Sequence, residues 1–300
     1  QFGSALLGFK TPVITDPNRV PQYTTKGVYG SFVVGSAGRS VIQVNHSIGA
    51  INGGTAADEQ YSLVRFGSSL TAVGTPAGDG TFSILVGAEA APNTVNGQVV
   101  KNAGAIYLVN FALIGAYGSN LAAQATFTYR GTQANEQVGK VVAVYQDTNG
   151  DGTPEILVGT PSANAKTGKV DVVDIMAGQV LATLSGDTKG QGFGSAVAVI
   201  PDTHAIVVGS PTYKDGKAAK AGAVDFYSGS VNTGFTRTDR ITGNKGDLLG
   251  SALAVGQYNG DGKADLAIGI PKADTTLPSV NGKKPKVLKD VGRVDVLAGE

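Results

Sequence analysis

The stretch Ile206-Val207-Val208-Gly209-Ser210-Pro211 decides the fold, because an apolar run of this kind, ending in Gly or Gly-x-Pro, recurs five times along the chain. The other copies occupy residues 32–35, 84–87, 156–161 and 266–271. A short continuous apolar run bounded by turn residues is typical of a β-strand buried on both faces. Repetition of one motif indicates a protein built from structural repeats.

Each apolar run stands between two other elements. Upstream lies an aromatic or aliphatic residue followed by Gly, as in residues 66–68 and 193–195, while downstream residues such as 223–227 alternate apolar and polar side chains. The alternation predicts a strand with one packed and one solvated face. A fourth, more polar strand follows, most clearly at 125–129 and 179–184. This graded order is what a blade needs when it stacks radially against its neighbours.

We therefore expect an all-β fold, a β-propeller of about five four-stranded blades, in a single domain that covers residues 1–300. The repeats are expected at residues 2–65, 66–130, 131–190, 191–246 and 247–300. The fifth repeat stops after its third strand, which favours one module of a larger protein. A β-sandwich also has many short strands, but nothing in that architecture requires one motif order to recur.

The composition suits strands and tight turns, and it narrows the classes of function. There are 44 Gly, 12 Pro and only 16% charged residues, with a formal net charge of +1. This balance provides no field to hold nucleic acid or an anionic membrane surface. The chain has no Cys, which excludes disulfides, Cys-ligated zinc and thiol catalysis. No apolar run is long enough for a transmembrane helix. We expect a secreted protein, extracellular or on the cell surface, that is a monomer or a module of a larger surface protein.

Residues 147–155, Asp-Thr-Asn-Gly-Asp-Gly-Thr-Pro-Glu, place oxygen donors at alternate positions directly before an apolar run. Calcium takes about six to eight oxygen ligands from carboxylates and carbonyl groups. The expected ligands are the side chains of Asp147, Asn149, Asp151 and Glu155 and the backbone carbonyl of Thr153. The sequence therefore predicts a structural calcium ion, which offsets the entropy cost of ordering the loop. The alternative is an ordinary Asn-Gly or Asp-Gly turn without metal.

Residues 257–265 form the corresponding loop of the fifth repeat and predict a weaker calcium site. The expected ligands are Gln257, Asn259, Asp261, Asp265 and, through its backbone carbonyl, Lys263. The neutral amide of Gln257 stands at the first position, so one carboxylate is lost and the affinity should fall. The second repeat keeps only Asp79 of the pattern, which indicates a turn without metal, and the fourth repeat is too short here to form such a loop.

The paired Phe-Gly and Gly-x-Pro signatures resemble FG-GAP repeats, the units of the integrin α-subunit propeller and of many bacterial surface proteins. The resemblance covers nearly the whole chain and is weakest over residues 2–60, where no Pro follows Gly35-Ser36. It implies a β-propeller, extracellular placement, calcium in some blades, and adhesion or ligand binding. Calcium loops of such blades lie between the first and second strands, where residues 147–155 also lie.

We expect a non-catalytic module that binds a protein or glycan ligand on a cell surface or matrix. A carbohydrate-active enzyme or a lectin on the same propeller is the alternative, and a purely structural module of a stalk or surface layer is a third class. Asp171 with Asp174, or Asp225 with Asp295, could serve as paired acids, but Asp171, Asp225 and Asp295 occupy equivalent positions on three strands and are expected to be architectural. The absence of Trp argues against sugar stacking. The basic loops 212–221 and 272–290 are candidates for ligand recognition.

Overall fold

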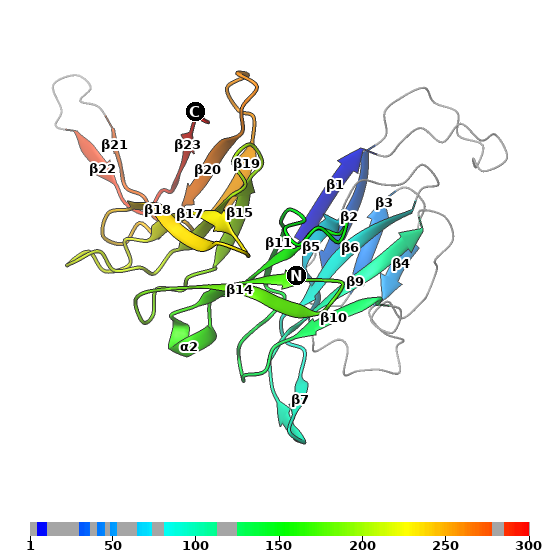
Figure 1. Ribbon diagram of the computed structural model, residues 1–300. Coiled ribbons are helices and arrows are strands. Elements are labelled where there is room, and N and C mark those ends of the chain that lie inside the picture. The colour runs from blue at the N-terminus through cyan, green and yellow to red at the C-terminus, as the bar shows by residue number, and fades with distance from the viewer. Residues whose placement is uncertain are drawn as a thin grey trace. The chain divides into compact units, whose positions relative to one another are not determined.

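The regular secondary structure of the described residues consists almost entirely of antiparallel strands, most of which pair with their neighbours in sequence (Figure 1). The computed structural model describes residues 5–10, 30–36, 41–45, 49–52, 65–73, 81–112, 125–277 and 285–299. Within these ranges the one helical segment is α2 (Ala163–Lys166), whose Asn164 and Ala165 have left-handed backbone angles. The chain forms two compact units, Gln1–Val144 with Ile175–Gly178, and Tyr145–Asp174 with Gln179–Glu300.

The first two sheets lie in the first unit. One sheet has the order β1-β2-β3-β4, from strands β1 (Ala5–Lys10), β2 (Gly30–Ser36), β3 (Val41–Asn45) and β4 (Gly49–Asn52). The other has the order β10-β9-β6-β5, from β5 (Phe66–Val73), β6 (Thr81–Ala88), β9 (Ala105–Ala112) and β10 (Phe127–Arg130). A small hairpin, β7 (Asn93–Val95) and β8 (Gln98–Val100), is inserted between β6 and β9.

Three further sheets follow along the chain. The third has the order β11-β12-β13-β14, from β11 (Val141–Val144), β12 (Ile156–Thr160), β13 (Lys169–Asp174) and β14 (Gln179–Ser185). The fourth has the order β15-β16-β17-β18, from β15 (Ala196–Ile200), β16 (Ala205–Ser210), β17 (Ala223–Ser230) and β18 (Gly234–Thr242). The fifth has the order β19-β20-β23, from β19 (Ala252–Gly256), β20 (Asp265–Ile270) and β23 (Arg293–Leu297). The hairpin of β21 (Thr275–Leu277) and β22 (Lys286–Leu288) precedes β23.

The all-β fold of propeller blades is confirmed, with four complete four-stranded blades where about five were expected. The fifth sheet has three strands, because no strand among the described residues pairs with the outer edge of β23. Apolar side chains of β23 are correspondingly open to solvent, with Val294 exposed by 64% and Val296 by 51%.

The expected gradient of burial across a blade is also present, with one correction. All five residues of β12 are buried, whereas β18 is exposed at most positions. The third strand was expected to have a solvated face, and this is wrong for β13, where five of six residues are buried. The reason is Asp171, which is only 1% exposed because Lys169 Nζ and Thr183 Oγ1 both contact its carboxylate at 2.7 Å.

Neighbouring blades meet along a seam, where glycine residues allow the two backbones to approach closely. Gly222, with φ of 81°, forms a parallel bridge with Leu249 of the next blade. A Cβ added at Gly209 would lie under 3.0 Å from the Gly250 carbonyl oxygen, closer than real Cβ atoms come. The Gly of the apolar run and the Gly of the Phe-Gly element are therefore partners across one seam, where two backbones meet without side chains between them.

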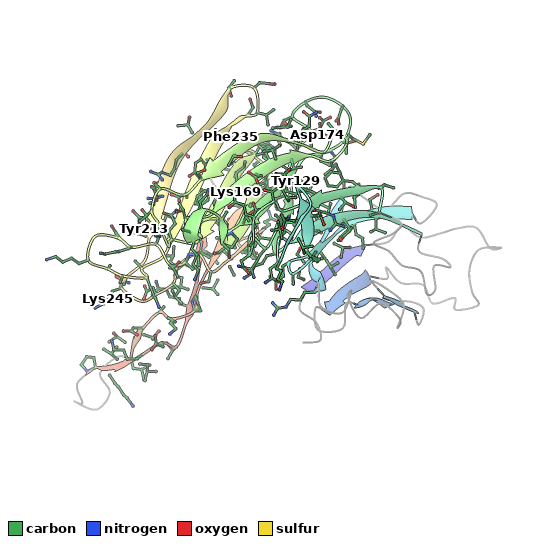
Figure 2. The ribbon with its side chains drawn as sticks, turned by 90° about the horizontal axis from the view of Figure 1, so that it is seen from below. Tyr129, Lys169, Asp174, Tyr213, Phe235 and Lys245 are labelled. Atoms are coloured by element: carbon green, nitrogen blue, oxygen red, sulfur yellow. The ribbon has the colours of Figure 1, made fainter. Side chains whose placement is uncertain are left out.

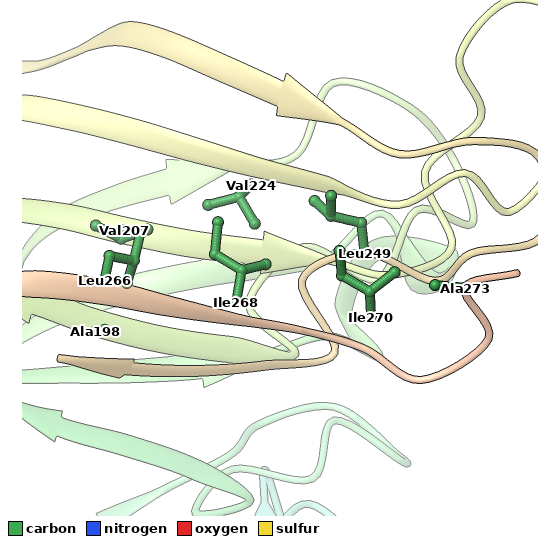
Figure 3. Close-up of a cluster of buried hydrophobic side chains, with 8 residues drawn as sticks. All are labelled: Ala198, Val207, Val224, Leu249, Leu266, Ile268, Ile270 and Ala273. Atoms are coloured by element: carbon green, nitrogen blue, oxygen red, sulfur yellow. The ribbon is translucent and has the colours of Figure 1, made fainter. Parts of the chain in front are cut away.

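An apolar cluster fills the space beside this seam (Figure 3). It combines side chains of the fourth sheet with side chains of the fifth, together with residues of the two adjoining loops. The members are Ala198, Val207, Val224, Leu249, Leu266, Ile268, Ile270 and Ala273. Ile270 and Val207 are fully buried. Packing of the second and third strands of one blade against the second strand of the next is the radial contact expected of propeller blades.

A buried acid or amide closes the turn before each of three seams, a feature that the sequence analysis did not identify. Glu136, Gln191 and Asp247 are 3%, 1% and 5% exposed. Each accepts a hydrogen bond from the backbone N–H three residues earlier, at 3.0, 2.9 and 2.9 Å. Each also stands two residues before the aromatic or aliphatic residue of the next Phe-Gly element, so this spacing is the signal by which such turns can be found.

Candidate metal centre

The loop before β12 is anchored at its base by the strand pairing. The Tyr145 N–H donates to the Glu155 carbonyl at 2.8 Å, and the Glu155 N–H donates to the Gln146 carbonyl at 3.3 Å. These bonds bring the two ends of the predicted calcium loop together and place Glu155 at the start of a buried strand. All of the predicted ligands therefore project from one short, closed turn.

Within the loop, the predicted ligands already use part of their acceptor capacity on the backbone. Asp147 accepts from the Gly150 and Gly152 N–H groups at 2.7 and 2.9 Å. Asp151 Oδ1 accepts from the Thr153 N–H at 2.8 Å. Both glycines have positive φ, 81° and 86°, so glycine is the residue that fits these positions. A carboxylate oxygen has more than one lone pair and can also bind a cation.

One carboxylate oxygen of Glu155 has no hydrogen-bond partner in this loop. The residue is 1% exposed, and its Oε2 accepts from the Thr148 N–H at 2.7 Å. Its Oε1 is buried and has no hydrogen-bond partner, and the same is true of the nearby Thr148 hydroxyl. An unpaired buried carboxylate oxygen is costly, so native structures seldom leave one without a proton donor, water or cation.

A carboxylate from outside the loop faces the same place. Asp174, at the end of β13, is 7% exposed, and its Oδ2 accepts from Asn149 Nδ2 at 2.9 Å. The same Nδ2 donates to Asp151 Oδ2 at 3.2 Å. Asp174 was not predicted from the sequence as a member of the loop site. The signal was the strand register, since Ile156 pairs with Val173 and residue 174 is therefore the neighbour of residue 155.

The loop before β20 differs from this arrangement. Asp265 is 1% exposed, and its oxygens accept from the N–H groups of Tyr258, Asn259 and Gly299 at 2.7, 3.2 and 2.9 Å. The Gly299 and Tyr258 N–H groups lower the pKa of this carboxyl, and burial opposes the shift. Asp261 Oδ1 accepts from the Lys263 N–H at 2.8 Å. Here the inner acidic residue is satisfied by the protein itself.

Gln257 does not reproduce the role of Asp147. No hydrogen bond joins its side chain to Gly260 or Gly262 within the part of the chain that the structure describes. The predicted site residues of both loops are thus brought into one turn each, but only the loop at 147–155 retains a buried acceptor without a partner. The second-repeat turn around Asp79 lies outside the described residues.

The donor set of the first loop fits a hard cation. Across the described ranges, no three His, Cys, Asp or Glu side chains already stand together in a group ready to hold a metal. The carboxylates instead point at backbone N–H groups, and the Asn149 amide stands between two of them. All candidate ligand atoms in the first loop are oxygens, which suits calcium or magnesium and not zinc or copper.

Three of the four acids considered for catalysis form ion pairs. Asp225 is fully buried, and Arg240 binds it through Nε at 2.5 Å and Nη2 at 2.9 Å. Asp187 accepts from Arg240 and Arg237 at 3.0 Å each. Burial raises the pKa of the neighbouring Tyr227 to about 12, with Asp225 adding to the shift. A buried carboxylate held by a bidentate arginine is stabilised in its charged form, as in an architectural ion pair.

Asp171 and Asp295 follow the same pattern with cations from their own strands. Lys169 stands two residues before Asp171, and Arg293 stands two residues before Asp295, with Nε and Nη2 at 2.6 and 3.1 Å from its carboxylate. The prediction that these equivalent acids are architectural therefore agrees with the contacts that all three make. They are not gathered in one site, since each belongs to a different sheet.

Both basic loops predicted to carry recognition adjoin the segment 244–248. The Gly246 and Leu248 N–H groups donate to the Ala219 and Lys220 carbonyls, and the Lys272 N–H donates to the Asp247 carbonyl, each at 3.1 or 3.2 Å. Tyr213 and Lys245, from two of these segments, are labelled in Figure 2. Lys214, Lys217, Lys220, Lys245 and Lys272 are all exposed. The described parts of both loops are thus fixed by backbone hydrogen bonds at one edge of the second unit.

Nothing in the described part of the chain has the length and apolar character of a membrane-crossing helix. No curated protein matches the chain in sequence. The model of the FG-GAP repeat matches residues 138–173 and 249–297, the two segments that contain the candidate calcium loops. These segments hold the first three strands of the third sheet and the strands of the fifth, so the sequence resemblance and the strand order coincide. The chain therefore contains FG-GAP repeats, carried by propeller-type blades.

Proposed function

We propose that this chain is an extracellular, calcium-stabilised, non-catalytic module that binds a protein or glycan ligand on a cell surface or matrix. FG-GAP repeats on propeller blades support a ligand-binding or adhesion-type module. The observation that supports the calcium part is the buried Glu155 Oε1, which lacks a partner inside a turn rich in oxygen donors. Three of the acids considered for catalysis, Asp171, Asp225 and Asp295, are engaged in ion pairs.

The residues that would hold the ion are the side chains of Asp147, Asn149, Asp151 and Glu155 and the backbone carbonyl of Thr153. A bound calcium ion supplies a positive charge that satisfies several oxygens at once. In this role it fixes the loop and the start of β12, since Glu155 is the residue directly before that strand. The ion is structural, because it stabilises the folded chain by mass action.

The second loop is the weaker site. Gln257 supplies no charge, and the Asp265 oxygens already accept from the N–H groups of Tyr258, Asn259 and Gly299. A cation at Asn259, Asp261, Asp265 and the Lys263 carbonyl would have to compete with these donors. We therefore propose that loop 147–155 fills at a lower calcium concentration than loop 257–265.

Ligand recognition is assigned to the opposite end of the blades from the calcium loops. Consecutive strands run antiparallel, so the loop before β20 and the loop after it lie at opposite ends of that strand. The loops after β16 and β20 carry exposed lysines. Positive charge on a rigid scaffold attracts ligands with carboxylate or sulfate groups.

Calcium binding is tested by titrating the ion into the metal-free chain while heat and melting temperature are recorded. We expect one tighter and one weaker binding event. At a free calcium concentration of 100 times the dissociation constant, the folded state gains about 2.7 kcal/mol per site. Excess chelator should lower the melting temperature without loss of the β-sheet circular dichroism signal. No heat of binding together with an unchanged melting curve would overturn the calcium proposal.

Ligand binding is tested with arrays of acidic glycans and matrix proteins at low and physiological salt. We expect capture of a ligand that falls when Lys214, Lys217 and Lys220 are changed together to Ser. The matched control changes three lysines outside these loops, Lys101, Lys140 and Lys189, in the same way. Equal loss in both triple variants would contradict the assignment of recognition to the loop after β16.

A further inference from the structure

Asp174 lies outside the predicted calcium loop but is hydrogen-bonded into it. It is the last residue of β13, and its burial leaves only 7% of the residue exposed. Its Oδ2 lies 2.9 Å from Asn149 Nδ2. The strand register brings it there, because Val173 pairs with Ile156, the residue after Glu155. The fold therefore adds to the loop, through Asn149, a carboxylate that is distant from it in sequence.

The Asn149 amide stands where a cation would be most favourable. Its Nδ2 donates to Asp151 Oδ2 at 3.2 Å as well as to Asp174, so two carboxylates converge on one partly positive group. A half-turn of this amide would exchange Nδ2 for Oδ1, with loss of the hydrogen bond that Oδ1 accepts from the Asp151 N–H at 3.0 Å, and would leave three oxygens facing one point. Such a set repels itself unless a cation fills it, and hard oxygens of this kind are calcium ligands.

An independent feature also points to a ligand at this place. Glu155 Oε1 is buried without a partner, while the other oxygen of the same carboxylate accepts from the Thr148 N–H of the loop. Hydrogen bonding inside the loop therefore leaves one oxygen of the Glu155 carboxylate unsatisfied. A buried carboxylate oxygen in this state requires a cation, a proton or water.

We propose that Asp174 is a calcium ligand that completes the site of loop 147–155 from outside the loop, with the Asn149 amide turning to present its oxygen to the ion. This inference rests on the proposed calcium function of the same loop. The extra carboxylate sets the order of affinity of the two loops, because the charge of the ligands tunes calcium affinity.

The other blades show what the absence of this residue does. The strand register places Ala298 at the matching position of the fifth sheet, since Leu297 pairs with Leu266. There the next residue, Gly299, donates its N–H to Asp265 Oδ1 at 2.9 Å. In the fourth sheet, which has no calcium loop, the matching residue is Ser228, since Tyr227 pairs with Ile206. Among the third, fourth and fifth sheets, the carboxylate occurs only beside the loop with the unmet acceptor.

The test compares the wild-type chain with Asp174→Asn by calorimetric titration of calcium and by terbium luminescence lifetimes in light and heavy water. We expect calcium affinity at one site to fall about 10- to 100-fold. We also expect terbium bound there to gain about one coordinated water, because a lost protein ligand is replaced by solvent. The control is Asp239→Asn, which makes the same change of charge on the exposed strand β18. It should leave both values unchanged.

Two further variants keep the test decisive. If Asp174→Asn does not fold, Asp174→Ser replaces it, because Ser228 occupies the matching place in the fourth sheet. Ala298→Asp should tighten calcium binding at loop 257–265. If the wild type binds calcium but Asp174→Asn keeps its affinity and terbium hydration, the Asp174 assignment is wrong and the calcium function stands. If the wild type takes up no calcium, both fail.

Discussion

The seam between the fourth and fifth blades can be tested by adding a single methyl group. In Gly209→Ala, the new Cβ would lie under 3.0 Å from the Gly250 carbonyl oxygen and 3.3 Å from the Ala196 Cβ. The closest obstacle is backbone of the next blade and cannot move aside by a side-chain rotation. The two blades must therefore separate, which loosens the cluster of Val207, Val224 and Ile268 behind them. Overpacking of this kind costs about 1–3 kcal/mol, and we expect a value near 3 kcal/mol.

The matched control is the equivalent glycine of the fifth blade. A Cβ at Gly269 would meet only the Ala252 Cβ at 3.2 Å and other Ala252 atoms at 3.5 Å. This neighbour lies in the same sheet and can shift by a few tenths of an ångström. We expect Gly269→Ala to cost less than about 1 kcal/mol, since its overpacking is far milder than at Gly209.

Urea unfolding followed by circular dichroism measures the two variants under identical conditions. Gly209→Ala should shift the midpoint clearly, and the melting temperature should drop by about 6–12 °C, at about 2–4 °C per kcal/mol. Gly269→Ala should stay close to the wild type. Equal loss in the two variants, or a wild-type midpoint for Gly209→Ala, would refute the view that glycines join neighbouring blades backbone to backbone.

Three other changes probe the candidate metal loop, the ion pairs and the pH response. Glu155→Gln should abolish the stabilisation that calcium produces at loop 147–155, which is about 2.7 kcal/mol at 100 times the dissociation constant. The metal-free variant should melt no lower than the metal-free wild type, because the substitution removes an unpaired buried charge. A lower metal-free melting temperature would contradict this. Arg240→Leu should cost about 3–5 kcal/mol in urea unfolding, since it leaves the buried Asp225 with only the more distant Arg237 Nη1 at 3.7 Å, and Arg240→Leu with Asp225→Leu should recover most of the loss. The pKa of Asp265 is lowered in the folded chain by the Gly299 N–H, so its carboxylate stabilises the fold above its unfolded pKa of about 3.9 and loses this effect as the pH falls through the lower folded value. Stability measured between pH 5 and about pH 2 should therefore fall less steeply in Asp265→Asn, and parallel curves would count against the shift.

Strand order was open to prediction because each blade repeats one local pattern. The apolar run becomes a buried second strand, as in β12 and β16, since its hydrophobicity admits no solvated face. The hairpin of β7 and β8 was equally visible in principle. Its turn is Asn96-Gly97, both with positive φ of 50° and 76°, the pair that favours a two-residue hairpin.

The burial of charged residues on third strands was not open to prediction. Asp225 looks like the solvated member of an alternating strand, yet it is fully buried. Its partner Arg240 lies on β18, directly opposite in the register, and this pairing includes an irregularity between Phe226 and Tyr227. The apolar and polar pattern of one strand does not predict which Lys or Arg side chain of a neighbouring strand will pair with its acid. It also does not predict where a bulge will shift the register between the two strands.

The candidate metal loops show that local sequence is also insufficient to predict how two similar sites differ. Both loops share the Asn-Gly-Asp-Gly core, and both lie in segments matched by the FG-GAP repeat model. Besides Gln257 in place of Asp147, the two loops differ in the residues at the end of the third strand. In the fifth sheet the Gly299 N–H satisfies the inner acid, whereas in the third sheet Asp174 adds a further acceptor and Glu155 Oε1 remains unpaired. A loop pattern therefore predicts where a cation can bind, and in our proposal the residues beside its last acid, brought there by the strand register, tune the affinity of each loop for that cation.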